Sequence, residues 1–245
     1  MIKFELVLPC YNESKSLVYL IQRARQAALD HGFQEGEFRL VMVENGSRDD
    51  SRKVFADLEK SEWAKWFKVV IVEVNQGYGY GLWQGLKTTE APIVGWSHAD
   101  QQCDPTDAFK AYNLLKQQEP AAHQVFVKGV RHGRNWKDVM VSRVFEFLAW
   151  LILGVKIYEM NAQPKVFHRS LLERMQNPPK TFAFDLYAIY HAQKNNFKFE
   201  TVSVQFPPRV HGLSNWSSHF LSRYKTILGI IRYMISLCKT EGRVR

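Results

Sequence analysis

The chain has 245 residues, 46% of them hydrophobic and 13% aromatic, and a formal net charge of +9. This composition is that of a globular protein with a sizeable core and excludes a disordered one. The basic excess predicts an anionic partner, such as nucleic acid, a lipid surface or a phosphorylated substrate.

The N-terminal segment MIKFELVLP has neither the long apolar region nor the small-residue cleavage site of a signal peptide, so we interpret it as a first strand. No uninterrupted apolar stretch reaches the roughly 18 residues that span a bilayer. Three cysteines without metal-binding spacing fit a reducing compartment. We therefore expect a cytoplasmic protein that is soluble or peripheral on the cytoplasmic face of a membrane.

The first half of the chain alternates short apolar runs with amphipathic segments. The expected strands are Phe4–Leu8, Leu40–Val43, Val69–Val74, Ile93–Trp96 and Val125–Val127. The expected helices are residues 17–28, Asp50–Leu58, Tyr80–Leu86 and Thr106–Leu115. This alternation predicts an α/β fold with right-handed crossovers and a mostly parallel central sheet flanked by helices.

The second half continues with apolar helices over Val139–Leu153 and Phe184–Gln193 and an alternating strand over Phe199–Phe206. We predict one domain over residues 1–216, followed by a basic amphipathic helix over residues 217–245. Such a helix fits the headgroup region of an anionic membrane. The same pattern is expected for a terminal helix packed on its own domain or for a contact in a homo-oligomer.

Polar loops follow four of the predicted strands, at residues 9–13, 44–50, 75–81 and 98–104. In a parallel sheet these loops converge on the carboxyl edge, where ligands bind. His98 and Asp100, two residues apart on an extended chain, point the same way and could share one divalent cation that neutralises a diphosphate. The same segment is also typical of a solvated surface turn.

Two common nucleotide-binding patterns are disfavoured or absent. Gly77, Gly79 and Gly81 follow the third predicted strand and lack the spacing of the dinucleotide fingerprint, which disfavours an NAD-type oxidoreductase. No GxxxxGK[ST] segment occurs, which excludes a P-loop nucleotidase.

In this order the loops resemble the motifs of glycosyltransferase family 2 on the GT-A fold. The resembling segments are PCYNE at 9–13, ENGSRD at 44–49, NQGYGYG at 75–81, HADQQCDP at 98–105, NAQPK at 161–165, Phe184-Asp185 and RVHGLS at 209–214. Within that family the chain is similar to polyprenyl-phosphate sugar transferases of the dolichyl-phosphate mannose synthase type. The resemblance implies a metal-dependent, inverting hexosyltransferase that acts in cell-envelope polysaccharide biosynthesis.

The resemblance also implies roles for individual residues on the donor side. The base and ribose of a UDP- or GDP-sugar would contact the following residues: Pro9, Tyr11, Glu13, Glu44, Gly46 and Gly79. Asp100, with His98 or Gln102, would hold Mn²⁺ or Mg²⁺ against the diphosphate. His98, where the family has aspartate, could favour Mn²⁺ or could instead bond a neighbouring loop.

The expected acceptor is a polyprenyl phosphate or a lipid-linked glycan, and a phosphate acceptor, which is already anionic, needs orientation by cations more than a general base. The candidates for the diphosphate and the acceptor are Arg131, Arg134, Lys137, Ser142, Arg143, Arg209 and His211. Arg209 and His211 could equally belong to a solvated loop. If the acceptor is a sugar hydroxyl, Asp185 is the candidate general base, or else an acid that only interacts with its helix dipole. A non-catalytic nucleotide-sugar or membrane-surface binding protein is the other alternative, and nucleic acid is the least expected partner.

Overall fold

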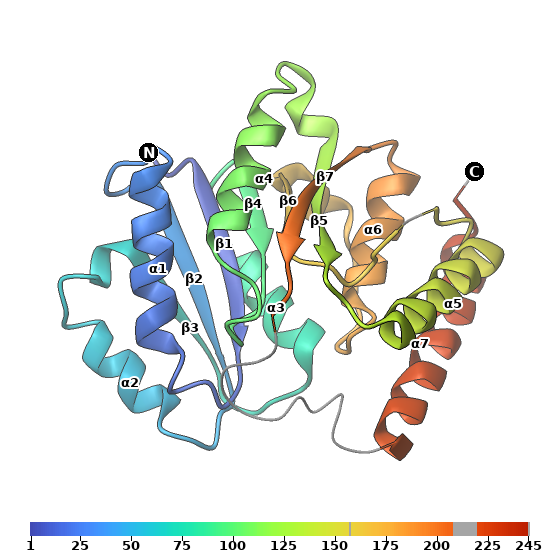
Figure 1. The fold of residues 1–245 in the computed structure, drawn as a ribbon, viewed down its shortest axis with the longest axis horizontal. Helices are drawn as coiled ribbons and strands as arrows, with labels where there is room; N and C mark the ends of the chain where they lie inside the picture. Colours follow the sequence, from blue (N-terminus) through green and yellow to red (C-terminus); the bar gives the residue numbers. More distant parts are fainter. Residues whose placement is uncertain (157, 208–219, 245) are drawn as a thin grey trace.

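The structure is a computed structural model that describes residues 1–156, 158–207 and 220–244, except the side chains of Lys137 and residues 220–225. Its centre is a seven-stranded sheet. The strands are β1 (Phe4–Cys10), β2 (Phe38–Asn45), β3 (Phe67–Val72), β4 (Ile93–Trp96), β5 (Val125–His132), β6 (Lys165–His168) and β7 (Lys198–Gln205). Their order across the sheet is β3-β2-β1-β4-β6-β5-β7 (Figure 1).

The strand directions confirm the mostly parallel sheet. β1 pairs in parallel with β2 and β4, β2 with β3, and β5 with β7. Only β6, among the described strands, runs the other way, between β4 and β5. The carboxyl ends of β1, β2, β4 and β5 therefore lie at one edge of the sheet.

The described helices surround this sheet. The α-helices are α1 (Leu17–Asp30), α2 (Ser51–Leu58), α3 (Tyr78–Lys87), α4 (Thr106–Lys116), α5 (Trp136–Leu153), α6 (Phe184–Lys194) and α7 (Phe220–Glu241). The short 3₁₀ helices are η1 (Ala64–Trp66), η2 (Ala121–Gln124) and η3 (Arg169–Arg174).

Two hydrophobic cores lie on opposite faces of the sheet. Alternate residues of a strand point to opposite faces, so Leu6 belongs to the core under α1, α2 and α4, whereas Val7 belongs to the core under α3, α5, α6 and α7. Figure 1 shows α1 and α2 at one end of the molecule and α5 and α7, side by side, at the other.

Strand β6 was not among the predicted strands. It has four residues and follows Pro164. Only Val166 and Phe167 of its four residues are apolar, so β6 lacks the continuous apolar run that marks a short buried strand such as Ile93–Trp96.

The C-terminal helix packs on its own domain along one face. Ile230, Met234 and Leu237 of α7 are buried in the core shared with α5 and α6. Beyond the helix, the Tyr190 hydroxyl donates to the Gly242 carbonyl at 2.9 Å. No helix within the described residues is long and apolar enough to cross a membrane.

Candidate active site

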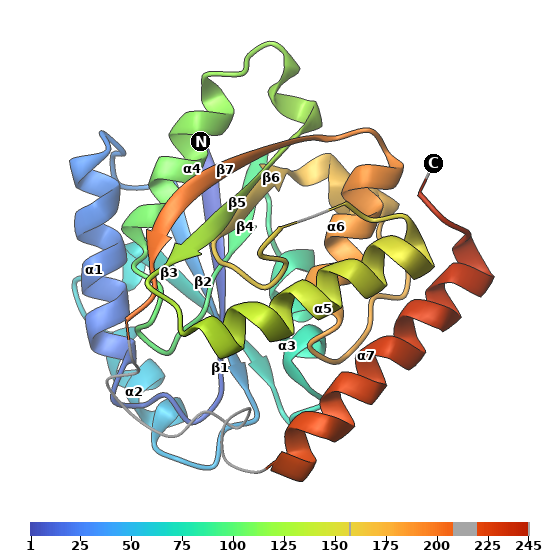
Figure 2. The ribbon, with the colours of Figure 1, turned by 45° about the vertical axis from the view of Figure 1, so that its right-hand side comes forward.

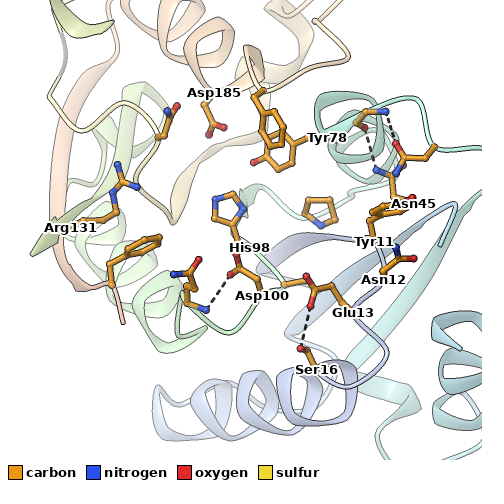
Figure 3. A pocket seen from close by; sticks show the side chains of 18 of the residues that line it. Tyr11, Asn12, Glu13, Ser16, Asn45, Tyr78, His98, Asp100, Arg131 and Asp185 are labelled. Carbon is orange, nitrogen blue, oxygen red and sulfur yellow. Dashed lines mark hydrogen bonds between the residues drawn. The ribbon is translucent and has the colours of Figure 1, made fainter. Parts of the chain in front are cut away.

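A cavity of about 1200 Å³ opens at the carboxyl edge of β1, β2, β4 and β5 (Figure 3). Its remaining walls come from residues 75–78 at the start of α3, the first half of α5, residues 160–161, the start of α6, Phe206 beyond β7 and Ile230 of α7. The predicted site residues that line it are Pro9, Tyr11, Glu13, His98, Asp100, Gln102, Arg131, Arg134, Ser142 and Asp185. The parallel sheet thus brings residues that are far apart in the sequence, from Pro9 to Asp185, together in one cavity, as expected for loops that follow parallel strands.

The loops after β1 and β2 hold each other in place. Asn12, in the left-handed region at φ 57°, donates its N–H to Ser47 Oγ at 3.1 Å and accepts from the Arg48 N–H at 2.8 Å. The N–H of Ser14 donates to Asp49 at 3.0 Å. These bonds fix the rim where Tyr11 and Glu13 face the cavity.

Glu44, Gly46 and Gly79 lie outside the cavity lining and shape the loops beside it. The buried carboxylate of Glu44 accepts from the Ser47 N–H and from Arg52 Nε at 2.8 Å. A Cβ on Gly46, at φ +69°, would lie 2.5 Å from the amide nitrogen of Asn75. A Cβ on Gly79 would lie 2.2 Å from the Pro179 carbonyl oxygen. Only glycine permits these approaches, and nucleotide contact by these residues stays a prediction.

The His98–Asp100 segment places an imidazole and a carboxylate at the cavity, as Figure 3 shows. Asp100 is 8% exposed and accepts from the Gln102 N–H at 3.2 Å. The Gln102 side chain donates to the Pro207 carbonyl at 2.9 Å, which ties this loop to the end of β7. Burial lowers the pKa of His98, which favours the neutral imidazole that a metal ion requires.

These two side chains are a partial donor set for a cation. Nowhere in the described part of the chain do three His, Cys, Asp or Glu residues gather as a complete metal site. Mg²⁺ and Mn²⁺ in nucleotide sites commonly take one or two protein ligands and complete their shell with substrate phosphates and water. Asp100 and His98 fit that type of site.

Asn45 and Tyr78 also line the cavity and were not predicted as site residues. Asn45 Oδ1 is buried and has no hydrogen-bond partner among the described residues. Buried polar atoms normally have partners, so this oxygen is open for a ligand. The hydroxyl of Tyr78 is also buried, and burial together with the nearby Asp185 raises its pKa. The Tyr78 ring lies between His98, at 5.8 Å, and Phe182, at 5.2 Å between ring centroids.

Asp185, at the start of α6, is buried and held by three donors on one oxygen. Its Oδ1 accepts from Trp96 Nε1 at 3.2 Å, from Gln163 Nε2 at 3.0 Å and from the ammonium of Lys165. Burial alone would raise the pKa of Asp185, but the charge and hydrogen bond of Lys165 lower it below its usual value. Lys165 is fully buried in β6, and the sequence motif that contains it indicated no role for it.

The acceptor-side arginines share one buried carboxylate. Arg131 Nε donates to Glu159 Oε2 at 2.6 Å, and Arg134 pairs with Glu159 Oε1. Arg131 lines the cavity, and its guanidinium also lies over the Phe206 ring, 5.1 Å from the ring centroid. Nothing in the sequence indicated Glu159.

The other predicted acceptor residues are placed less centrally. The Ser142 hydroxyl donates to the Asp138 carbonyl at 3.0 Å. Arg143 lies outside the cavity lining, 58% exposed, and pairs with Glu146 at 3.2 Å. The side chain of Lys137, and Arg209, His211 and the predicted boundary at residue 216, lie outside the described residues.

The family model that matches this chain is described as glycosyl transferase family 2 and covers residues 5–176, more than half of the chain. The chain belongs to glycosyl transferase family 2. The match confirms the family predicted from the strand-end motifs and the class of enzyme, a glycosyltransferase.

Two curated relatives illustrate the sequence similarity. The undecaprenyl-phosphate 4-deoxy-4-formamido-L-arabinose transferase of Pseudomonas savastanoi pv. phaseolicola is 26% identical over 71% of this chain and 50% of that protein. The dodecaprenyl-phosphate galacturonate synthase of Rhizobium johnstonii is 21% identical over 95% of this chain and 67% of that protein. The chain thus spans about half to two thirds of the length of these two relatives.

Two solved structures share the fold. Mannosyl-3-phosphoglycerate synthase from Rubrobacter xylanophilus superposes with a TM-score of 0.73 at 15% identity, over 100% of this chain and 76% of that one. Glucosyl-3-phosphoglycerate synthase from Mycobacterium tuberculosis, solved with Mn²⁺ and UDP, gives 0.65 at 18% identity, over 99% and 81%. These likenesses confirm the GT-A fold.

Proposed function

We propose that this cavity transfers a sugar from a UDP- or GDP-sugar to a polyprenyl phosphate in envelope polysaccharide assembly. The observation that carries the proposal is the single cavity that joins the donor-side loops, through Asp100, to the paired arginines. The curated relatives, which are named for undecaprenyl and dodecaprenyl phosphate, support a lipid phosphate as acceptor.

The donor occupies the side formed by the loops after β1, β2 and β4. Tyr11 and Glu13 lie where the base and ribose are expected, and Asn45, with its open Oδ1, and Tyr78 line the part of the cavity left for the diphosphate and sugar. Asp100 and His98 would hold Mn²⁺ or Mg²⁺, and the bound ion would supply the Lewis acid that stabilises the departing nucleoside diphosphate. The similar mycobacterial synthase, whose complex contains Mn²⁺ together with UDP, supports this assignment.

The acceptor occupies the side of Arg131 and Arg134. A phosphate monoester is already anionic near neutral pH, so these cations position it and no general base is needed. One of its oxygens attacks the anomeric carbon as the bond from that carbon to the diphosphate breaks, and the electron pair leaves with the diphosphate. A single displacement of this kind inverts the anomeric configuration.

The pKa of Asp185 favours a phosphate acceptor over a sugar hydroxyl. A carboxylate acts best as a general base when its pKa lies near the working pH. Burial raises the pKa of Asp185, but the charge and hydrogen bond of Lys165 bring it below its usual value. Asp185 serves instead to hold Trp96, Gln163 and Lys165 together beside Tyr78.

The acceptor class is tested by mass spectrometry of products from a panel of nucleotide sugars, with and without Mn²⁺. Each donor is offered a short polyprenyl phosphate and the matching polyprenol, which differ only in the phosphate. We expect a glycosyl-phosphate product that depends on the metal and no product from polyprenol. Transfer to polyprenol or to soluble glycans would instead support the hydroxyl alternative, and Asp185→Asn should then abolish it. The absence of any transfer would support the non-catalytic alternative.

A further inference from the structure

Helix α5 has its apolar side turned outward. Six large hydrophobic residues on one face of this helix are exposed, and this set is the outward face of α5: Trp136, Met140, Val144, Phe147, Trp150 and Leu151. Trp136 is 65% exposed and Phe147 is 56% exposed. The spacing of four, four, three, three and one residues keeps all six on one side of a 3.6-residue helix.

The opposite face of the same helix is already used. Phe145, Ala149 and Leu153 are buried in the core, and Phe145 also lines the cavity. The outward face is therefore additional apolar surface that the described part of the chain leaves uncovered. A contiguous exposed patch of this kind marks a contact with a membrane or another protein.

Positive charge accompanies this face. Arg143 lies within it, with its side chain 58% exposed. α7, which lies beside α5 in Figure 2, adds the exposed residues Arg232 and Lys239. Among the described residues, no exposed carboxylate lies on the outward face of α5 or on α7, because Asp138 of α5 lies on the cavity side and Glu241 is half-buried beside Lys194.

We propose that the outward face of α5 lies on an anionic lipid bilayer. Its Phe, Leu, Met and Val side chains enter the acyl boundary, its tryptophans lie at headgroup level, and Arg143 contacts lipid phosphates. A second copy of the chain fits this face less well, since two copies would bring the cations of both together.

The cavity is next to this surface because α5 forms one wall of it, through Val141, Ser142 and Phe145. A lipid phosphate at the bilayer surface is therefore separated from the cavity by α5 alone. This inference deepens the proposed function, on which it rests for the presence of a lipid acceptor. The sequence predicted membrane contact for the basic helix over residues 217–245, and this proposal adds α5, a helix within the catalytic domain.

The test is co-sedimentation with vesicles of phosphatidylcholine, with and without an equal part of phosphatidylglycerol, in the absence of donor and acceptor. The parent protein should bind the phosphatidylglycerol vesicles more tightly. Phe147→Ser with Leu151→Ser should weaken that binding by about 100-fold, because two large side chains no longer leave water. The matched control is Ile71→Ser on β3, a 58% exposed apolar residue at the far edge of the sheet, which should bind like the parent.

Thermal unfolding and nucleotide-sugar binding of the double variant should match the parent, since the changed side chains are exposed. Three results would overturn the inference: parent-like vesicle binding by the double variant, no effect of phosphatidylglycerol, or a parent dimer that the double variant dissociates. Failure of sugar transfer with intact vesicle binding would overturn only the proposed function. Failure of vesicle binding with intact transfer would overturn only this inference.

Discussion

The buried pair of Lys165 and Asp185 allows a quantitative prediction. Lys165 is fully buried and Asp185 is 4% exposed, so their charges compensate each other out of water. Lys165→Met removes the cation, keeps an unbranched side chain of similar length, and leaves the carboxylate without its partner. Removing one member of a buried pair costs about 3–5 kcal/mol of folding free energy. For a chain of this size, each kcal/mol lowers Tm by about 2–4 °C, so we expect a fall of roughly 6–20 °C.

The pH dependence has a definite sign. In the parent protein the pKa of Asp185 is lowered, so its stabilising effect is present above the unfolded value of 3.8 and is lost as pH falls through the folded pKa. In Lys165→Met the charge and hydrogen bond that oppose burial most strongly are gone, so the pKa of Asp185 rises relative to the parent. The stability deficit of the variant should therefore be greatest at neutral pH and shrink as pH approaches about 4.

A double variant separates lost charge compensation from lost packing. Asp185→Asn in the Lys165→Met background removes the stranded charge and keeps an oxygen that can accept from Trp96 and Gln163. We expect it to recover at least about half of the lost stability. Urea unfolding at pH 7 and pH 5 gives the free energy of unfolding of the parent, both single variants and the double variant, and hence the cost of each substitution. A cost below about 1 kcal/mol for Lys165→Met, or a double-variant cost equal to the sum of the singles, would refute this reasoning.

Three further predictions concern Glu159, Lys128 and Gly79, which support the segments around the cavity. Glu159→Gln leaves Arg131 and Arg134 without a counter-ion and should lower the free energy of unfolding by about 2 kcal/mol. Inorganic phosphate should restore part of this loss, measured by thermal unfolding. Parent-like stability of the variant would show that Glu159 does not hold the arginines. Burial lowers the pKa of Lys128 to about 7. The unfolded chain therefore binds more protons between about pH 7 and 10, and the free energy of unfolding should rise with pH by up to about 1.4 kcal/mol per unit. Lys128→Met should lack this rise in denaturant titrations at pH 7 and 9, and an unchanged slope would contradict the assignment. Gly79→Ala should lower Tm, because the new Cβ would lie 2.2 Å from the Pro179 carbonyl oxygen. Gly229→Ala should not lower Tm, because a Cβ there would meet no neighbouring group within 4 Å.

Much of the fold was predictable because local patterns and tertiary structure agree. The strand Ile93–Trp96 was predicted with the bounds that the structure gives, since its short apolar run ends at a polar segment. The convergence of His98 and Arg131 followed from parallel strands, which place their carboxyl ends together. β6 could not be predicted, because its two apolar residues lie between Lys165 and His168 and its antiparallel pairing depends on distant strands.

Side-chain partners were less predictable than positions. Glu44 was expected at the ribose because of its place in a motif, yet its buried carboxylate bonds Arg52. Glu159 joins Arg131 and Arg134 across more than 20 residues of sequence. Such pairs depend on the three-dimensional approach of segments, and sequence spacing carries no signal for them.

The measurement that tests the account most directly compares sugar transfer to polyprenyl phosphate by the parent, Asp100→Asn and Asp104→Asn. Both variants change one carboxylate of the same loop, but Asp104 bonds Arg23 at 3.0 Å and lies outside the cavity lining. The account predicts that Asp100→Asn keeps its fold and loses metal-dependent transfer by at least about 100-fold, while Asp104→Asn transfers sugar at close to the parent rate. Full activity of Asp100→Asn, or equal losses in both variants, would contradict the assignment of the site.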